Sequence, residues 1–192
     1  MPVKNVFQTL EDRVDSDYDK LEREGPYKCS SKNSWLGEGY YFWDTFIENA
    51  HWWGQVRGYK NGYIICHAKC DFNNDECCDL VGNTEHMVQF IDAYNALFSA
   101  GIANEKTRIS RIIHHLKWEV RTFHFTAIRA YGVKSKDLGS RFAFTRYFQS
   151  NKQNSVIDLK PAIQICFYSK SALRLRNYRI VYPEMYSQDE VV

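Results

Sequence analysis

The chain has 192 residues, of which 44% are hydrophobic, and it carries 25 Lys and Arg against 23 Asp and Glu. This length and composition are typical of one soluble globular domain that buries its own core. No apolar run reaches the roughly 20 residues of a transmembrane helix, and the N-terminal residues lack the apolar core of a signal peptide. We therefore expect a cytoplasmic protein with no membrane partner.

The first predicted elements are a short strand around Val6 and an exposed helix in the charged segment 11–24. Apolar residues recur at helical spacing in that segment, and Gly25-Pro26 ends it.

The segment 35–43 is the most unusual part of the chain, because a glycine-bracketed turn runs into four consecutive aromatic residues. Gly37 and Gly39 allow a positive φ and a close approach of the backbone to a ligand. In an extended strand Tyr41 and Trp43 point to the same side. Two interpretations are open, namely a buried strand whose rings belong to the core and an aromatic platform at a ligand pocket.

The next predicted elements are a strand over 62–72, a helix that begins at Thr84 and stops near Gly101, and a helix over 106–118. Four cysteines cluster in this region, and with His86 they provide enough soft ligands for zinc. Their spacing fits no standard zinc motif, and cysteine is commonly a small buried residue. We therefore expect no metal site. The four are Cys66, Cys70, Cys77 and Cys78.

Strand-like periodicity dominates from about residue 121 onward, with Gly, Ser, Asn and Pro clusters between the runs. We expect one domain over residues 1–183 and a flexible tail over 184–192. The predicted strands cover 122–131, 142–148, 162–168 and 178–182. The chain has no phosphate-loop motif and no glycine-rich dinucleotide fingerprint, which disfavours an ATPase or a Rossmann dehydrogenase.

Two motifs resemble the ADP-ribosyltransferase superfamily, and in particular an uncharacterised bacterial branch of it. Gly37-Glu38-Gly39-Tyr40-Tyr41-Phe42 is similar to the Gly-x-Gly-aromatic-Tyr-[Phe/Leu] motif of its second strand, and 49–53 looks like the start of the following helix. The segment 163–167, running into 171–173, resembles its final strand. The resemblance implies an α+β fold in which two small antiparallel sheets form an NAD-binding cleft with flanking helices.

The resemblance also implies catalytic roles for Tyr41 and Gln164. Tyr41 would stack on the nicotinamide, and Gln164 would contact the ribose while the bond between C1′ and nicotinamide breaks. Two positions depart from the family pattern. Gln8 stands where the family has a histidine, and Gln164 stands where it usually has an acid. Since an amide stabilises developing positive charge less well than a carboxylate, we expect slow transfer.

The implied cofactor-binding residues are Gln8, Thr9, Gly39, Tyr41 and His51, with NAD as the substrate. Backbone groups near Gln8 and Thr9 would hold the nicotinamide amide. His51 could contact a phosphate or the ribose, or it could be a helix-surface histidine packed between tryptophans.

Charge is unevenly distributed along the chain. Residues 1–103 hold 9 Lys and Arg against 16 Asp and Glu, whereas residues 104–181 hold 16 against 4. The basic half interleaves aromatic residues, which suits a polyanion, although its cations could instead solubilise the domain or pair with the acidic half. We predict Arg141, Arg146 and Lys152 as target-binding residues.

The sequence thus predicts an NAD-dependent mono-ADP-ribosyltransferase, a glycosyl-transferring enzyme of the kind found among bacterial toxins and defence effectors. The acceptor is a protein or a nucleic acid, and a neutralising partner protein and the oligomeric state are left open. The alternative is a non-catalytic module of the same fold that binds a nucleotide or nucleic acid through its basic C-terminal half.

Overall fold

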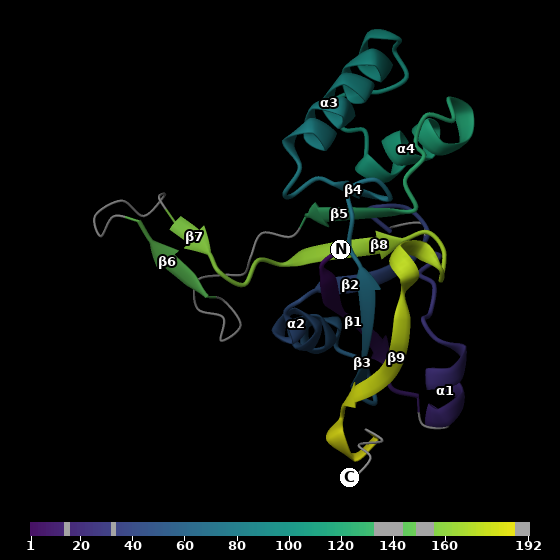
Figure 1. Ribbon diagram of the computed structural model, residues 1–192, viewed down its shortest axis with the longest axis vertical. Coiled ribbons are helices and arrows are strands. Elements are labelled where there is room, and N and C mark those ends of the chain that lie inside the picture. The colour runs from purple at the N-terminus through teal and green to yellow at the C-terminus, as the bar shows by residue number, and fades with distance from the viewer. Residues whose placement is uncertain (14–15, 32–33, 133–143, 149–155, 187–192) are drawn as a thin grey trace.

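The computed structural model describes residues 1–13, 16–31, 34–132, 144–148 and 156–186 as an α+β fold (Figure 1). Its strands are β1 (Val3–Glu11), β2 (Tyr40–Asp44), β3 (Tyr63–Asp71), β4 (Cys77–Asp79), β5 (Ala127–Tyr131), β6 (Thr145–Tyr147), β7 (Val156–Asp158), β8 (Ile163–Phe167) and β9 (Arg176–Tyr182). Its helices are α1 (Tyr18–Glu24), α2 (Ile47–Arg57), α3 (Thr84–Ser99), α4 (Ile109–His114), the π-helical turn η1 (His115–Glu119), and the 3-10 turns η2 (Ala172–Arg174) and η3 (Glu184–Tyr186).

Local sequence signals explain where the helices begin and end. Side-chain oxygens of Asp17 and Asn83 accept backbone N–H groups at the starts of α1 and α3, as N-cap residues do. The cap of α3 is therefore Asn83, and the helix begins at Thr84 as expected. Helix α2 ends at Gly58, whose φ of 61° is left-handed and is readily adopted by glycine.

Two predicted helices are shorter in the structure than the sequence pattern indicates. In the segment 11–24, Glu11 is the last residue of β1, and the chain becomes helical only at Tyr18. The segment 106–118 is α-helical only in α4 and continues as η1, where the Val120 N–H donates to the carbonyl of His115. The expected tail begins with η3, and Tyr186 stacks on Tyr18 with ring centroids 3.9 Å apart. Residues 187–192 lie outside the described part of the chain.

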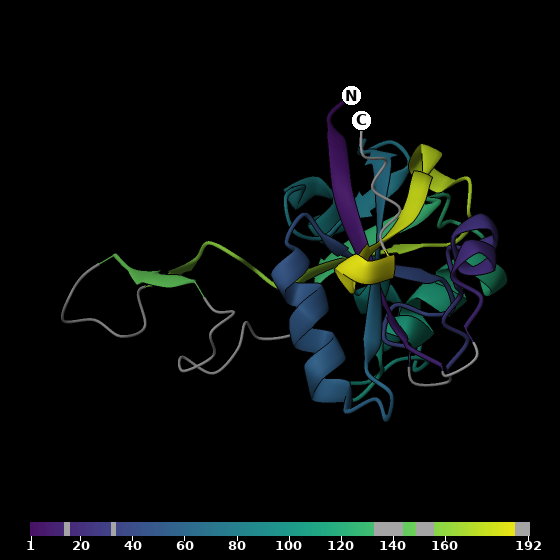
Figure 2. The ribbon, with the colours of Figure 1, turned by 90° about the horizontal axis from the view of Figure 1, so that it is seen from below.

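The main sheet has the strand order β4-β5-β8-β2-β1-β3-β9, in which β4 is parallel to β5 and all other neighbours are antiparallel. A separate antiparallel pair, β6–β7, extends away from this sheet in Figures 1 and 2. We expected two small antiparallel sheets, whereas the described strands form one seven-stranded mixed sheet and this pair. The reason is β1, which pairs with β3 along nine residues and also with β2 through Val6 and Phe7.

Helices cover both faces of the main sheet (Figure 2). The first face contacts α2 and α4, whose residues Ala50 and Ile113 join clusters with Trp43 and Ile128. The opposite, second face contacts α1 and η2. Side chains therefore alternate between two apolar layers along the central strands, and the core lies on both sides of the sheet.

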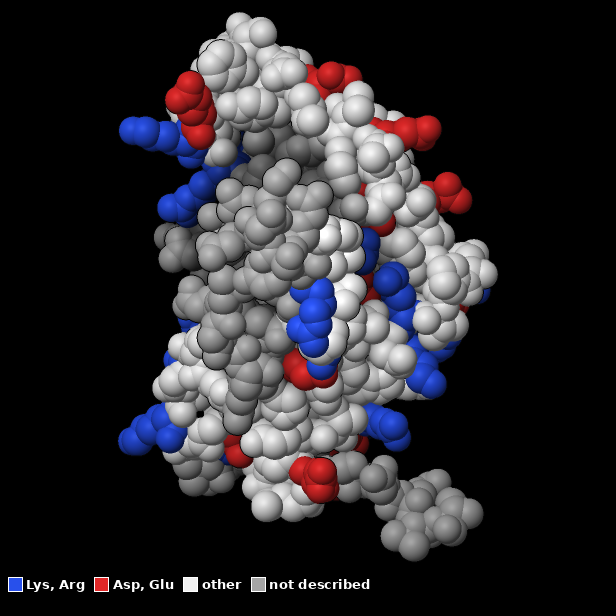
Figure 3. Space-filling model, turned by 90° about the vertical axis from the view of Figure 1, so that its left-hand side faces the viewer, with Lys and Arg blue, Asp and Glu red and all other residues white. Residues whose placement is uncertain are grey.

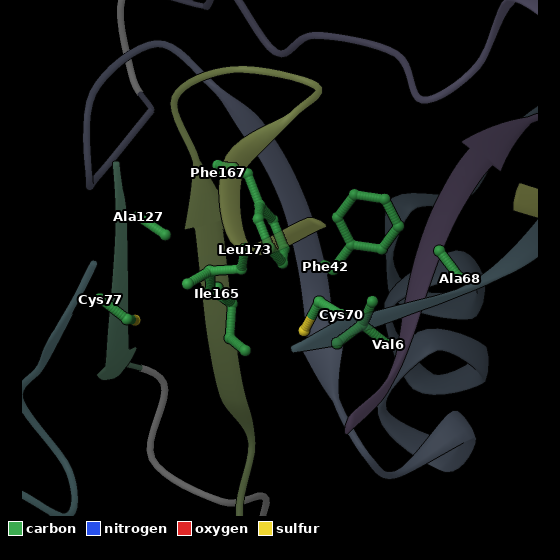
Figure 4. Close-up of a cluster of buried hydrophobic side chains, with 10 residues drawn as sticks. Val6, Phe42, Ala68, Cys70, Cys77, Ala127, Ile165, Phe167 and Leu173 are labelled. Atoms are coloured by element: carbon green, nitrogen blue, oxygen red, sulfur yellow. The ribbon is translucent and has the colours of Figure 1, made fainter. Parts of the chain in front are cut away.

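The central cluster on the second face joins β1, β2, β3, β5 and β8 to η2 (Figure 4). The rings of Phe42 and Phe167 meet edge to face with centroids 5.4 Å apart, and Val6, Ile165 and Leu173 are at most 1% exposed. Burial of each such side chain stabilises the fold by about 1.5–3 kcal/mol.

A buried group of charges lies beside this cluster. The Arg129 guanidinium donates to Asp44 at 2.7 Å and to Asp79 at 3.0 Å, and the Lys4 ammonium is 3.1 Å from Asp44. The two carboxylates are 3% and 4% exposed. Burial lowers the pKa of Arg129, but the two carboxylates outweigh burial and raise it overall. One guanidinium thus holds together residues from β2, β4 and β5.

We predict that Arg129→Met lowers the free energy of unfolding by about 3–5 kcal/mol, because it leaves two buried carboxylates without their common partner. Urea unfolding followed by circular dichroism measures the loss. Arg111→Met is the matched control, since Arg111 pairs with Glu119 at a surface where both side chains are at least 41% exposed, and it should cost about 1 kcal/mol or less. Equal losses in the two variants would contradict a structural role for the buried group.

Candidate functional site

Strands β8 and β2, which carry the two family-like motifs, and β1, which carries Gln8, are neighbours in the order β8-β2-β1. They bring Gln164, Tyr41 and Gln8 into the same part of the sheet. Tyr41 pairs with Cys166 and Trp43 pairs with Gln164. Because direct partners in an antiparallel pair lie on the same face and faces alternate along a strand, Tyr41 and Gln164 share the first face.

Gln8 lies on the second face. Phe7 pairs with Trp43, so the next residue of β1 points to the opposite side of the sheet. The structure therefore does not bring Gln8 and Gln164 together across one surface. Sequence spacing alone contains no information on this point, because the face of Gln8 depends on the register between β1 and β2.

Both polar atoms of the Gln8 amide form hydrogen bonds with other groups of the protein. Its Nε2 donates to the Tyr27 carbonyl at 2.8 Å, and its Oε1 accepts from the Tyr27 N–H at 3.0 Å and from the Tyr178 hydroxyl at 2.8 Å. Gln8 is 4% exposed, and burial raises the pKa of Tyr178 well above its ordinary value. Gln8 thus ties segment 25–28 and β9 to β1.

Thr9 and His51 contact protein groups around α2. The Thr9 hydroxyl donates to the Ala50 carbonyl at 2.9 Å. His51 Nδ1 lies 3.1 Å from the Tyr63 hydroxyl, and its ring meets Tyr182 edge to face with centroids 4.7 Å apart. These contacts hold α2 against β1, β3 and β9.

Gly39 and Tyr41 shape the turn before β2. A Cβ at Gly39 would lie 2.4 Å from the Cys166 Sγ, so this glycine lets β2 approach β8 closely. Gly37 has a φ of 89°, which the turn requires. The Tyr41 hydroxyl donates to the Gly37 carbonyl at 2.7 Å and accepts from the Leu36 N–H at 2.9 Å. Burial raises the pKa of the Tyr41 phenol, which therefore stays protonated.

Gln164 is 8% exposed and has one partner that the sequence did not suggest. Its Oε1 accepts from the Trp35 indole N–H at 2.9 Å. Within the described residues its Nε2 donates to no group, so one amide N–H₂ is left for a ligand. Trp35 also lies over Gly132, where a Cβ would be 1.8 Å from the Trp35 ring. The position of Trp35 just before Gly37 was the only sequence signal for this contact.

An open groove of about 590 Å³ lies where Gln8 holds Tyr27. Lys28 is 2.9 Å from Glu38, Lys170 donates to the Glu24 carbonyl, and Arg23 has no ion-pair partner among the described residues. The rings of Tyr27 and Tyr40 provide flat apolar surface beside these cations. The groove is lined by Arg23, Glu24, Gly25, Pro26, Tyr27, Lys28, Tyr40 and Lys170.

Of the predicted target-binding residues, only Arg146 lies in the described part of the chain. Arg146 is exposed on β6, and its guanidinium carbon lies 4.1 Å from the centre of the Phe144 ring. Arg141 and Lys152 fall outside the described residues. On the face seen in Figure 3, the described Lys and Arg side chains do not gather into one continuous patch, and Asp and Glu lie between them.

Among the described residues, no group of three or more His, Cys, Asp or Glu side chains is placed to hold a metal ion. Cys77 and Cys78 are adjacent on β4, and they belong to core clusters on opposite faces of the sheet. Burial raises the pKa of Cys66, Cys70 and Cys78 to about 12, so these sulfurs stay protonated.

Comparison of the chain with protein-family models, with curated proteins and with solved structures gives no match. No helix in the described ranges has the length and apolar character needed to span a bilayer.

We predict that Gln8→Leu lowers the free energy of unfolding by about 2–4 kcal/mol, since each buried polar group left without a partner costs roughly 1–3 kcal/mol. Hydrogen exchange should also speed up at the Tyr27 amide. Gln55→Leu, at an exposed position of α2, is the control and should have little effect. If Gln8→Leu keeps full stability and slow exchange at Tyr27, the amide is not a structural link.

Proposed function

We propose that the chain is an ADP-ribosyltransferase-like domain that binds NAD and transfers ADP-ribose slowly to an acceptor. The observation that carries the proposal is the adjacency of β8, β2 and β1. The two motifs that resemble the family lie about 120 residues apart in the sequence, and folding places them on paired strands with Trp43 opposite Gln164. Adjacency of β8 and β2 is what a shared site requires.

The limited pairing between β1 and β2 supports a cleft at this place. Val6 and Phe7 pair with Asp44 and Trp43, and no further pair joins the two strands. Segment 25–28 lies where the strands diverge, held by Gln8. In the proposed function, the halves of the sheet on either side of this divergence correspond to the two small sheets of the family.

The groove beside the divergence suits the anionic part of a dinucleotide. Arg23, Lys28 and Lys170 can place positive charge on a pyrophosphate, and Tyr27 and Tyr40 offer rings for stacking on a base. Its volume of about 590 Å³ lies within the range of roughly 300–1,000 Å³ that ligand pockets usually have.

The nicotinamide end of the ligand is assigned to the first face, beside Tyr41 and Gln164. Gln164 pairs with Trp43, three residues along β2 from Tyr40, so it lies about 10 Å along the strand from Tyr40 and on the opposite face of the sheet. In this proposal the ligand passes round the end of β2 to reach both the groove and Gln164. The free amide N–H₂ of Gln164 can orient a ribose hydroxyl. Without a carboxylate, the developing positive charge at C1′ is poorly stabilised, and the transfer is therefore slow.

We predict that NAD binds and that Arg23→Gln weakens binding by about tenfold, as expected for the loss of one charge-assisted hydrogen bond to a phosphate. Calorimetric titration measures both affinities. Lys20→Gln is the matched control, because Lys20 is exposed on the same helix and lies outside the groove. No binding of NAD to folded wild type would defeat the proposal. Equal affinities of the two variants would show that the phosphates do not bind beside Arg23.

A second test replaces the amide by the acid that the family usually has. Gln164→Glu should keep the hydrogen bond from Trp35, because the oxygen that accepts it is retained, and it adds a negative charge beside the ribose. We expect nicotinamide release from NAD to rise by about tenfold or more, equivalent to at least roughly 1.4 kcal/mol of transition-state stabilisation. Gln164→Ala should abolish release while leaving the melting temperature unchanged within a few degrees. Release that is indifferent to both substitutions would place the reaction at another site.

The second candidate is a non-catalytic domain that binds a nucleotide or nucleic acid. It is favoured because the Gln8 amide and the Tyr41 hydroxyl form hydrogen bonds with other groups of the protein. NAD binding without nicotinamide release, even in Gln164→Glu, would select this candidate. In either case Arg141, Arg146 and Lys152 are the residues proposed to meet a nucleic-acid or protein partner.

A further inference from the structure

A cavity of about 170 Å³ lies in the helical part of the molecule, between α3, η1 and the segment 122–125. It shares no lining residue with the groove beside Gln8. In Figure 1, α3 and α4 lie above β4 and β5, at the opposite end of the molecule from α1. The cavity is therefore a second pocket, distinct from that groove.

The cavity walls are aromatic and uncharged. Phe90, Phe123 and Phe125 line it together with Ala93 and Leu116. The rings of Phe123 and Phe125 meet edge to face with centroids 5.3 Å apart, so they present both faces and edges to the space. In the part of the chain that the structure describes, no Lys, Arg, Asp or Glu lines the cavity. A charged ligand would lose its hydration there without a compensating partner.

His86 provides a hydrogen-bond donor in this apolar setting. Its Nδ1 accepts the Asp79 N–H at 2.9 Å, which places the proton of the neutral ring on Nε2. His86 is 9% exposed and lines the cavity. Within the described residues its Nε2–H makes no hydrogen bond, so it is left to donate to a molecule that enters the cavity.

The volume of the cavity suits a ligand of about one ring. A protein cavity of about 150 Å³ holds a benzene molecule, and the present volume is about 170 Å³. The Cys78 thiol lines the cavity, and burial raises its pKa to about 12. The sulfur therefore stays protonated and is a poor nucleophile, so the pocket is suited to reversible binding.

We propose that this cavity binds an uncharged, single-ring planar compound whose carbonyl oxygen or ring nitrogen accepts the Nε2–H of His86. The three phenylalanine rings contact the ring of the ligand, and His86 fixes its orientation. Gln89, Thr122 and His124 are exposed residues of the lining, and they form the mouth through which the ligand enters.

Acetophenone and ethylbenzene are suitable probes, because both are uncharged and similar in size and only acetophenone has an acceptor. Each is titrated into the isotope-labelled full chain and followed by NMR of the amides and of the histidine ring N–H groups. We expect saturable shifts at the amides of Phe90, Ala93 and Phe123 with both compounds. The His86 Nε2–H resonance should move downfield with acetophenone and stay within its free range with ethylbenzene.

Ala93→Leu fills the cavity from the α3 side without changing any polar group, and Ala96→Leu adds the same side chain at an exposed position of α3. We expect Ala93→Leu to weaken acetophenone binding by about tenfold or more, since the added methylenes occupy the space of the ring, and Ala96→Leu to leave it unchanged. Melting temperatures of both variants show that the fold persists.

Absence of saturable shifts at the cavity amides would overturn the proposal, as would equal binding by the two leucine variants. Cavity shifts with an unmoved His86 resonance would overturn the assignment of His86 as the donor. None of these outcomes depends on whether NAD binds, because the titrations contain no nucleotide.

Discussion

The buried ion pairs of Arg129 are the constraint on which the rest of the sheet depends. Arg129 lies on β5, whereas its two carboxylate partners, Asp44 and Asp79, end β2 and β4. These strands are not all neighbours, since β8 lies between β5 and β2. The guanidinium thus fixes how β8 is held between its neighbours, and β8 carries Gln164. Removal of one partner leaves an unpaired buried charge, which is far more costly than loss of a surface pair.

Gln8 has the equivalent role on the other side of β2. Its amide contacts the backbone of Tyr27 and the hydroxyl of Tyr178, so it joins the N-terminal strand, segment 25–28 and the last strand of the sheet. A histidine at this position could not supply one donor and two accepting interactions with the same geometry. The glutamine is therefore explained by structure alone, and its departure from the family pattern does not by itself indicate lost function. In the proposed function, catalytic competence depends on Gln164 instead.

Sequence patterns predicted the elements better than their arrangement. Glycines and aromatic residues located β2, and helical periodicity located α3, because these signals are local. The single mixed sheet was not predictable, since it depends on β1 pairing with β2 through Val6 and Phe7. The same register between β1 and β2 places Gln8 and Gln164 on opposite faces of the sheet. Trp35 donates a hydrogen bond to Gln164, and Tyr178 donates one to Gln8. The sequence did not predict these two contacts, because the partners lie more than a hundred residues apart in the chain.

In the proposed function, the distribution of polar partners separates ligand binding from catalysis. Around β1 and β2 the hydroxyl of Tyr41 and the amide of Gln8 are bonded within the protein, so they stabilise the frame of the site. The groups left for a ligand are Arg23 in the groove and the amide N–H₂ of Gln164. A cation and an amide can bind and orient a dinucleotide, but neither stabilises positive charge at C1′. Under the proposed function the site would hold NAD better than it cleaves it, and a single carboxylate at position 164 is the smallest change that would alter this balance.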